Sequence, residues 1–159
     1  MNVANILRPE SVQCESEVRS KKHALELLSE VLGNRHEDLN AADVLAEFMK
    51  REQLGSTGLG HSIAMPHARF NGIDESIGAF LKLEAGVDFD SSDGEPVDLL
   101  FGVLVPENCS DDQIREMKEL IQQLRDSTLQ RQLRETTDPA ELYDLLTDSL
   151  TVIHRRIKT

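Results

Sequence analysis

The residues best suited to chemistry lie in one short run of the chain, from Arg51 to Arg69. The run contains glycines, small hydroxyl residues, two arginines and two histidines, the second of which, His67, follows Pro66. Glycine lets the backbone approach a ligand closely, and backbone N–H and hydroxyl groups can then face an anion. These residue types predict a phosphoryl site, and the hypothesis is that His67 carries the phosphoryl group.

The predicted chemistry assigns a role to each of these groups. An imidazole nitrogen can attack phosphorus directly, because it holds a free lone pair near neutral pH. Transfer then depends on positioning and on stabilising the charge of the equatorial oxygens, for which Arg51 and Arg69 are the predicted clamps. The other ring nitrogen of His67 needs an acceptor, and a backbone carbonyl of the glycine loop would serve. The predicted phosphoryl-binding loop, with N–H and hydroxyl donors, is Gly55, Ser56, Thr57 and Gly58.

Three competing kinds of site fit the same run less well. The stretch from Gly55 to Ser62 has the spacing of a nucleotide-binding P-loop, but His61 replaces the permanently charged Lys, and a helix precedes the glycines where a P-loop needs a strand. His61 and His67 lack a third metal ligand at a recognised spacing. No Gly-x-Ser-x-Gly elbow of a serine hydrolase is present. We therefore predict no metal and no cofactor.

Composition limits the class of protein. A length of 159 residues predicts one domain, residues 1–159. The net charge of −12 argues against nucleic acid and anionic membrane as partners, since both attract clustered Lys and Arg. No apolar run approaches the roughly 20 residues of a membrane span, and no secretory signal is recognisable. Cys14 and Cys109 form no disulfide or metal framework, so a cytoplasmic location is expected.

Two amphipathic helices are predicted before the run. Ser20 is a candidate N-cap of a helix that ends near Gly33, and Asn40 is a candidate N-cap of a second helix with Arg51 in its last turn. The pattern of residues 1–19 is weak, and Pro9 argues against one continuous helix there. The second helix therefore leads directly into the glycines.

Strands and helices are predicted to alternate after the run. Residues 77–83 indicate a strand with one buried face, and the almost continuously apolar residues 97–105 indicate a central strand. Ser110 and Gln113 form a capping box that begins a long helix, and Ser127 and Asp138 are placed to cap two more. Helices around a few strands predict an α/β or α+β class with a mixed sheet.

The motif Arg-Glu-x-Leu-Gly-Ser-Thr-Gly-x-Gly-x-x-Ile-Ala-x-Pro-His, from Arg51 to His67, resembles the signature of the phosphotransferase-system IIA family of fructose/mannitol type. Within that family it is most similar to the nitrogen-regulatory branch (EIIA-Ntr). The resemblance spans nearly the whole chain and is also carried by Phe89-Asp90, Gly94 to Phe101, Leu104-Val105-Pro106 and Glu141-Leu142-Tyr143.

The resemblance implies a three-layer α/β domain with a mixed β-sheet flanked by helices. It implies a transferase-type phosphoryl carrier in which His67 accepts a phosphoryl group from a small histidine phosphocarrier protein (HPr- or NPr-like), near the arginine that Arg51 matches. The nitrogen-regulatory branch implies a signalling role, read by target proteins such as potassium transporters or sensor kinases. Two alternatives stay open: a sugar-transport IIA component that passes phosphate to a IIB protein, and an interaction module that works without phosphorylation.

The sequence departs from the family pattern at two positions. Gln113 occupies the possible second-site position, where family members commonly have a second histidine, and its capping-box role is the favoured interpretation. Weakened onward transfer would suit a sensor that stores phosphate. His61 stands where the branch often has Asn, and is interpreted as a polar loop residue rather than a second phosphoryl acceptor.

Overall fold

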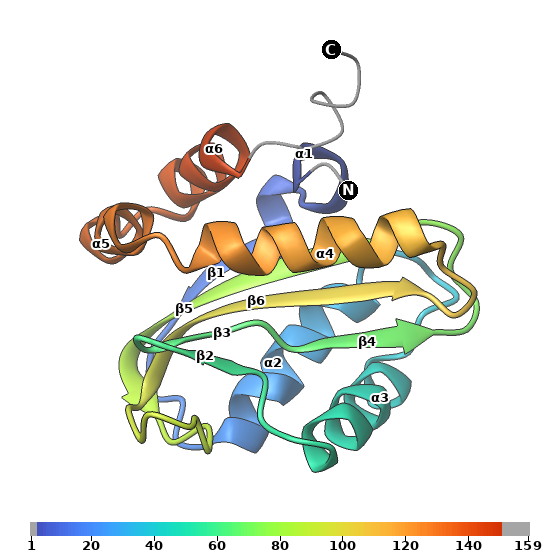
Figure 1. Ribbon diagram of the computed structural model, residues 1–159, viewed down its shortest axis with the longest axis horizontal. Coiled ribbons are helices and arrows are strands. Elements are labelled where there is room, and N and C mark those ends of the chain that lie inside the picture. The colour runs from blue at the N-terminus through green and yellow to red at the C-terminus, as the bar shows by residue number, and fades with distance from the viewer. Residues whose placement is uncertain (1–2, 151–159) are drawn as a thin grey trace.

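The computed structural model describes residues 3–150, and its centre is a six-stranded mixed β-sheet (Figure 1). β6 is central: it pairs antiparallel with β5 on one side and parallel with β3 and β4 on the other. β1 extends the sheet beyond β5, and β2 extends it beyond β3. The strands are β1 (Val12–Glu15), β2 (Gly58–Gly60), β3 (Ile63–Ala64), β4 (His67–Phe70), β5 (Ile77–Val87) and β6 (Val97–Pro106).

Helices cover both faces of the sheet, which confirms the predicted three-layer α/β fold. One core joins the sheet to α2 and α3, and the other joins the opposite face to α1, α4, α5 and α6. Figure 1 shows α4 on one side of the sheet and α2 and α3 on the other. The helices are α1 (Val3–Ile6), a 3₁₀ turn (Pro9–Ser11), α2 (Lys21–Gly33), α3 (Ala41–Gln53), α4 (Asp111–Leu124), α5 (Ser127–Glu135) and α6 (Pro139–Ser149).

Most of the predicted helix starts are confirmed by their caps. The side chains of Ser20, Asn40 and Asp138 each accept a backbone N–H in the first turn that follows, and Ser110 does the same in a complete capping box with Gln113. The prediction for α5 was wrong by one residue. Asp126 is the N-cap, and its carboxylate accepts the Thr128 N–H at 3.0 Å, because an ionised carboxylate at this end also complements the helix dipole.

β6 and the first part of β5, residues 77–83, are largely buried on both faces. The prediction for β6 is confirmed, but the single buried face predicted for residues 77–83 was wrong. Ala79 and Leu81 pack into the core of α2 and α3, whereas Phe80 packs into the opposite core. Gly78 is small because α1 approaches closely: a Cβ there would lie 3.2 Å from Ile6 Cδ1. The small size of Gly78 and Ala79 therefore reflects close packing on both sides of the strand and not exposure.

Candidate functional site

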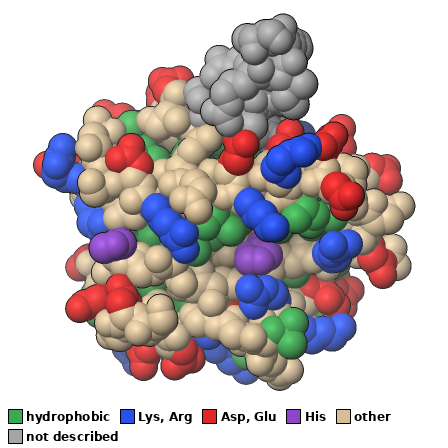
Figure 2. All heavy atoms as spheres, in the orientation of Figure 1, with side chains coloured by type: hydrophobic (Ala, Val, Ile, Leu, Met, Phe, Trp, Pro, Cys, Tyr) green, Lys and Arg blue, Asp and Glu red, His purple; other side chains and the backbone are tan. Residues whose placement is uncertain are grey.

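His67 begins β4, at the edge of the sheet where α3 from one layer and α4 from the other both lie close by (Figure 1). A cleft of about 410 Å³ opens there, lined by β4, the last two turns of α3 and the first half of α4. Lys and Arg side chains gather around the histidine near the middle of this face, whereas Asp and Glu lie mostly toward its outline (Figure 2). The cleft is lined by Glu47, Lys50, Arg51, Leu54, His67, Ala68, Arg69, Val105, Ile114 and Met117.

A short backbone connection fixes the ring of His67. β3 and β4 both run parallel to β6, and Met65 and Pro66 connect them without a break in the sheet, since the Pro66 carbonyl accepts the Val103 N–H at 2.9 Å. The Nδ1 atom of His67 lies 2.8 Å from the Met65 carbonyl oxygen. A carbonyl can only accept, so Nδ1 carries the hydrogen and Nε2 keeps its lone pair. The expected backbone acceptor is thus present, just beyond the glycine loop.

The electrostatic surroundings of His67 favour a neutral ring. Burial lowers its pKa below the ordinary value of 6.5, and the positive charge of Arg51 lowers it further. The hydrogen bond to the Met65 carbonyl and the negative charge of Glu52 act in the opposite direction, but the net pKa shift is downward. At neutral pH the ring is therefore a neutral imidazole with an unshared pair on Nε2, which is the form a nucleophile requires.

Arg51 and Arg69, the predicted charge clamps, both line the cleft with His67. Arg51 Nη1 donates to the Gly55 carbonyl at 2.8 Å, and Arg69 Nη1 donates to the Glu107 carbonyl at 3.1 Å. Among residues 3–150 no carboxylate forms an ion pair with either guanidinium. Each guanidinium retains further N–H donors and a full positive charge, so the cleft is suited to an anion.

The glycine loop is held by the protein's own groups. Ser56 donates its hydroxyl to the Phe89 carbonyl at 2.7 Å, and Thr57 donates both its N–H and its hydroxyl to the Glu52 carboxylate. Gly58 packs so tightly that a Cβ there would collide with Ser91. These groups, predicted as anion donors, are directed into the fold, because the loop anchors the strand that leads to His67. Gly55, with φ of 143°, makes the turn after α3. Direct binding of a phosphoryl group by this loop remains a prediction.

Glu52 was not singled out from the sequence, although it lies next to Arg51 in the motif. Its side chain is 5% exposed, and Lys21 Nζ of α2 lies 2.9 Å from its Oε1 atom. A carboxylate in the last turn of a helix usually faces solvent, because water screens its unfavourable interaction with the negative end of the helix dipole. Its burial follows from Lys21, which is distant in sequence, so only the tertiary structure could reveal it.

The two remaining predicted residues are Gln113, in the first turn of α4, and His61, in the turn between β2 and β3. Gln113 Oε1 accepts the Ser110 N–H at 2.9 Å, so the favoured capping role is confirmed, and the α4 residues in the cleft are Ile114 and Met117. His61 sits in the exposed turn between β2 and β3, with φ of 57°, and its N–H donates to Asp93 Oδ2 at 2.9 Å. That turn lies at the end of β6 opposite to His67.

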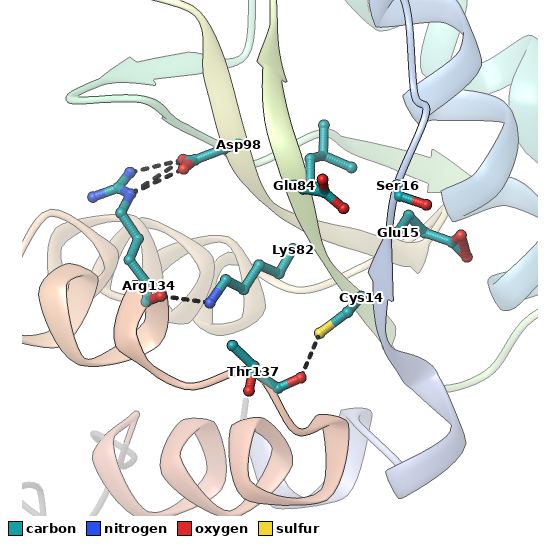
Figure 3. A pocket seen from close by; sticks show the side chains of 9 residues that line it. Cys14, Glu15, Ser16, Lys82, Glu84, Asp98, Arg134 and Thr137 are labelled. Atoms are coloured by element: carbon teal, nitrogen blue, oxygen red, sulfur yellow. Dashed lines mark hydrogen bonds and ion pairs between the residues drawn. The ribbon is translucent and has the colours of Figure 1, made fainter.

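A second cavity, of about 520 Å³, lies elsewhere, between β1, β5 and the connection from α5 to α6 (Figure 3). Lys82 Nζ donates there to the carbonyls of Leu133, Arg134 and Thr136, at 3.0, 2.6 and 2.6 Å. The Arg134 guanidinium faces the Asp98 carboxylate, with Nη2 and Oδ1 3.0 Å apart. Burial raises the pKa of the Cys14 thiol, with Asp138 and Glu15 adding to this and Lys82 opposing it. We call this region the polar cavity; its cations are neutralised or bonded within the protein.

Two further classes of site find no support in the described part of the chain. Residues 3–150 contain no group of three or more His, Cys, Asp or Glu side chains arranged to hold a metal ion. In the same residues, no helix has both the length and the apolar character needed to cross a bilayer.

The fold and the cleft match a known class of protein. Residues 5–149 fit the model of the family described as phosphoenolpyruvate-dependent sugar phosphotransferase system, EIIA 2, and the chain belongs to that family. Members of this family are components of the phosphotransferase system.

Individual relatives narrow the resemblance to the nitrogen-regulatory branch. A nitrogen regulatory protein of Klebsiella oxytoca is 34% identical over 150 residues, covering 94% of this chain and 92% of the relative. The crystal structure of nitrogen regulatory protein IIA-Ntr from Neisseria meningitidis superposes with a TM-score of 0.83 at 35% identity, covering 91% of this chain and 99% of that one. IIA mannitol from Escherichia coli shares the fold, with a TM-score of 0.67 at 23% identity, covering 86% and 96%.

Proposed function

We propose that the protein is a phosphohistidine carrier and regulator of a nitrogen-related phosphotransferase system, with Nε2 of His67 as the phosphoryl acceptor. The observation that carries this proposal is the bond from Nδ1–H to the Met65 carbonyl, which leaves the Nε2 lone pair free. The cleft around it is lined by two guanidinium groups that form no ion pair with a carboxylate of residues 3–150. The donor is a small histidine phosphocarrier protein, and the phosphorylation state of His67 is the signal that target proteins read.

The transfer step needs no proton to move. The Nε2 lone pair forms the new bond to phosphorus while the donor's phosphorus–nitrogen bond breaks, and its electron pair returns to the donor nitrogen. The ring of His67 becomes more positive as this bond forms, and the Met65 carbonyl stabilises that charge through Nδ1–H. Arg51 and Arg69 are placed to neutralise the oxygens of the transferred group.

The rim of the cleft suits a protein donor. Leu54, directly after α3, is 84% exposed, the highest exposure of a large hydrophobic residue between positions 3 and 150. It lies beside Ile114 and Met117 in the lining of the cleft. Leu54, Ile114 and Met117 thus place apolar side chains beside the charged groups of the cleft, and the buried centre of a protein interface is typically apolar.

The test is phosphorylation by the upstream carriers. Incubation with phosphoenolpyruvate and the general carrier proteins is expected to add one acid-labile phosphate per chain, and His67→Ala is expected to abolish it. The matched control is His61→Ala, which removes a histidine at the far end of β3 and is expected to label normally. Labelling that survives His67→Ala would overturn the proposal.

The family description names a sugar phosphotransferase system, so a relay role is the second candidate. In that role the phosphoryl group passes to a IIB protein, as the resemblance implies for sugar-transporting members. Adding IIB proteins to the phosphorylated chain separates the two functions. A regulator keeps its phosphate under conditions in which a transport component loses it within a single encounter.

A further inference from the structure

Glu52 forms a buried polar cluster behind the ring of His67. Its Oε1 accepts the Thr57 N–H at 3.1 Å and lies 2.9 Å from Lys21 Nζ, while its Oε2 accepts the Thr57 hydroxyl. Thr57 is 3% exposed. Lys21 is held in turn above the Phe89 ring, with Nζ 4.8 Å from the ring centroid. A buried carboxylate with these partners has a fixed position, because a lost partner would leave a charged group unsatisfied.

A continuous path of hydrogen bonds leads from this cluster to the imidazole. The Thr57 carbonyl accepts the Met65 N–H at 3.1 Å, so both polar groups of the Thr57 backbone are engaged. The Met65 carbonyl, at the other end of the same residue, accepts Nδ1–H of His67 at 2.8 Å. Pro66 stiffens the link between them, since its ring fixes φ. Glu52 is therefore connected, through the Thr57 backbone, to the residue whose carbonyl selects the tautomer of His67, in addition to the pairing of that segment with β6.

We infer that Glu52, anchored by Lys21, is the positioning residue that holds His67 in its Nδ1–H tautomer, acting through Thr57 and the Met65 carbonyl. The inference rests on the proposed function for its importance, because only that tautomer presents the Nε2 lone pair to phosphorus. Arg51 and Glu52, adjacent residues of α3, thus have different roles at the site. Arg51 faces the cleft and holds the Gly55 carbonyl, whereas Glu52 faces inward and holds Thr57.

Other charges near the ring do not replace this role. Arg51 and Glu52 reach His67 from α3 and have opposite effects on its pKa. The remaining charged residues of the cleft are Glu47 and Lys50, which bond to each other, and Arg69, which bonds to the Glu107 carbonyl. Of these groups, only Glu52 is joined by hydrogen bonds to the segment that carries the Met65 carbonyl.

The test compares Glu52→Ala and Glu52→Gln with the natural protein, using Glu26→Gln as a matched control that removes an exposed carboxylate from α2. Imidazole nitrogen NMR reports the tautomer of His67 without any phosphoryl donor. The second readout is the rate of phosphorylation by phosphoramidate, a small donor that needs no docking. Amide spectra establish that each variant is folded.

The natural protein and Glu26→Gln are expected to show the Nδ1–H tautomer alone. Glu52→Ala is expected to show both tautomers and to react about tenfold to a hundredfold more slowly, as misplacement of a reacting group commonly costs. Glu52→Gln is expected to fall between them, because its amide oxygen still accepts the Thr57 N–H but no longer pairs with Lys21.

A second pair of variants covers the case in which Glu52→Ala does not fold. Thr57→Val removes only the hydroxyl, and Thr57→Ser keeps both donors, so the tautomer is expected to shift in the former and not in the latter. A folded Glu52→Ala or Thr57→Val protein with an unchanged tautomer and an unchanged rate would overturn the inference. Failure of the proposed function has a different signature: the tautomer responds to Glu52, but the natural protein gains no phosphate on His67.

Discussion

The His67 cleft and the polar cavity use similar side chains, at opposite ends of β6, with different results. In the polar cavity Lys82 donates to three carbonyls, and Arg134 pairs with Asp98. In the cleft, Arg51 and Arg69 each bond to one carbonyl and face no carboxylate among the described residues. A satisfied cation stabilises the fold, whereas an unpaired one, in a chain of net charge −12, is available to an anion.

Arg51→Met is the substitution expected to have the largest effect on phosphorylation of His67. It keeps much of the side-chain volume and removes the charge and the bond to the Gly55 carbonyl, so phosphorylation of His67 is expected to slow about a hundredfold. Arg115→Met, which removes an exposed arginine of α4 that pairs with Asp112, is the matched control and should react at the natural rate. Single-turnover kinetics with a phosphorylated carrier measure both. Equal rates for the two variants would show that the Arg51 guanidinium does not contribute to phosphorylation of His67.

Lys82→Met tests whether the polar cavity contributes to stability and not to phosphorylation. Removing the ammonium group leaves the carbonyls at the end of α5 without their donor, which should lower the free energy of unfolding by about 1–3 kcal/mol. Denaturant unfolding measures this loss. The rate of phosphorylation at a temperature where the variant is folded should not change. A large loss of rate with unchanged stability would mean that the polar cavity takes part in function.

Changes in the pKa of His67 are expected to be smaller, and their direction is predicted to differ between two variants. The natural ring should titrate below 6.5, because burial and Arg51 both disfavour its protonated form. Arg51→Met removes a positive charge and should raise the pKa, whereas Glu52→Gln removes a negative charge and should lower it. Since the neutral ring is the nucleophile, the acid limb of the rate profile should move in the same directions. Imidazole NMR across a pH series measures the shifts, and shifts of the same sign in both variants would contradict the electrostatic description.

Gln113→His is expected to have the mildest effect. It restores a histidine at the family's second position, at the cost of the capping box with Ser110. If Gln113 allows the protein to store phosphate, the histidine variant should lose its phosphate several-fold faster. Gln113→Glu preserves the capping box and is the control for helix stability. Equal lifetimes of the phosphorylated natural and histidine proteins would remove the storage hypothesis.

Local signals explain which parts of the fold could be predicted. The caps at Ser20, Asn40, Ser110 and Asp138 each bond within one turn of their own helix, so the sequence around them suffices. β1 was not predicted, because Val12–Glu15 becomes a strand only by parallel pairing with β5, which lies far along the chain.

At the candidate site too, some features could be predicted from local sequence and others depend on residues distant in the chain. Arg51 and His67 were predicted together because the motif holds both and a family resemblance supported it. The hydrogen bonds from the Ser56 hydroxyl to the Phe89 carbonyl and from the Thr57 hydroxyl to the Glu52 carboxylate could not be predicted. A hydroxyl beside glycine can donate to a ligand or to the protein, and the local sequence does not distinguish the two. The role of Lys21 depends on how α2 packs beside α3, which residue types alone do not show.

Phosphorus–nitrogen coupling, measured by NMR on the phosphorylated, nitrogen-labelled protein, identifies the atom that accepts the phosphoryl group. We expect a single phosphorus bonded to Nε2 of His67, with the hydrogen on Nδ1 still bonded to the Met65 carbonyl. Phosphorus bonded to Nδ1, or to any nitrogen of His61, would contradict it.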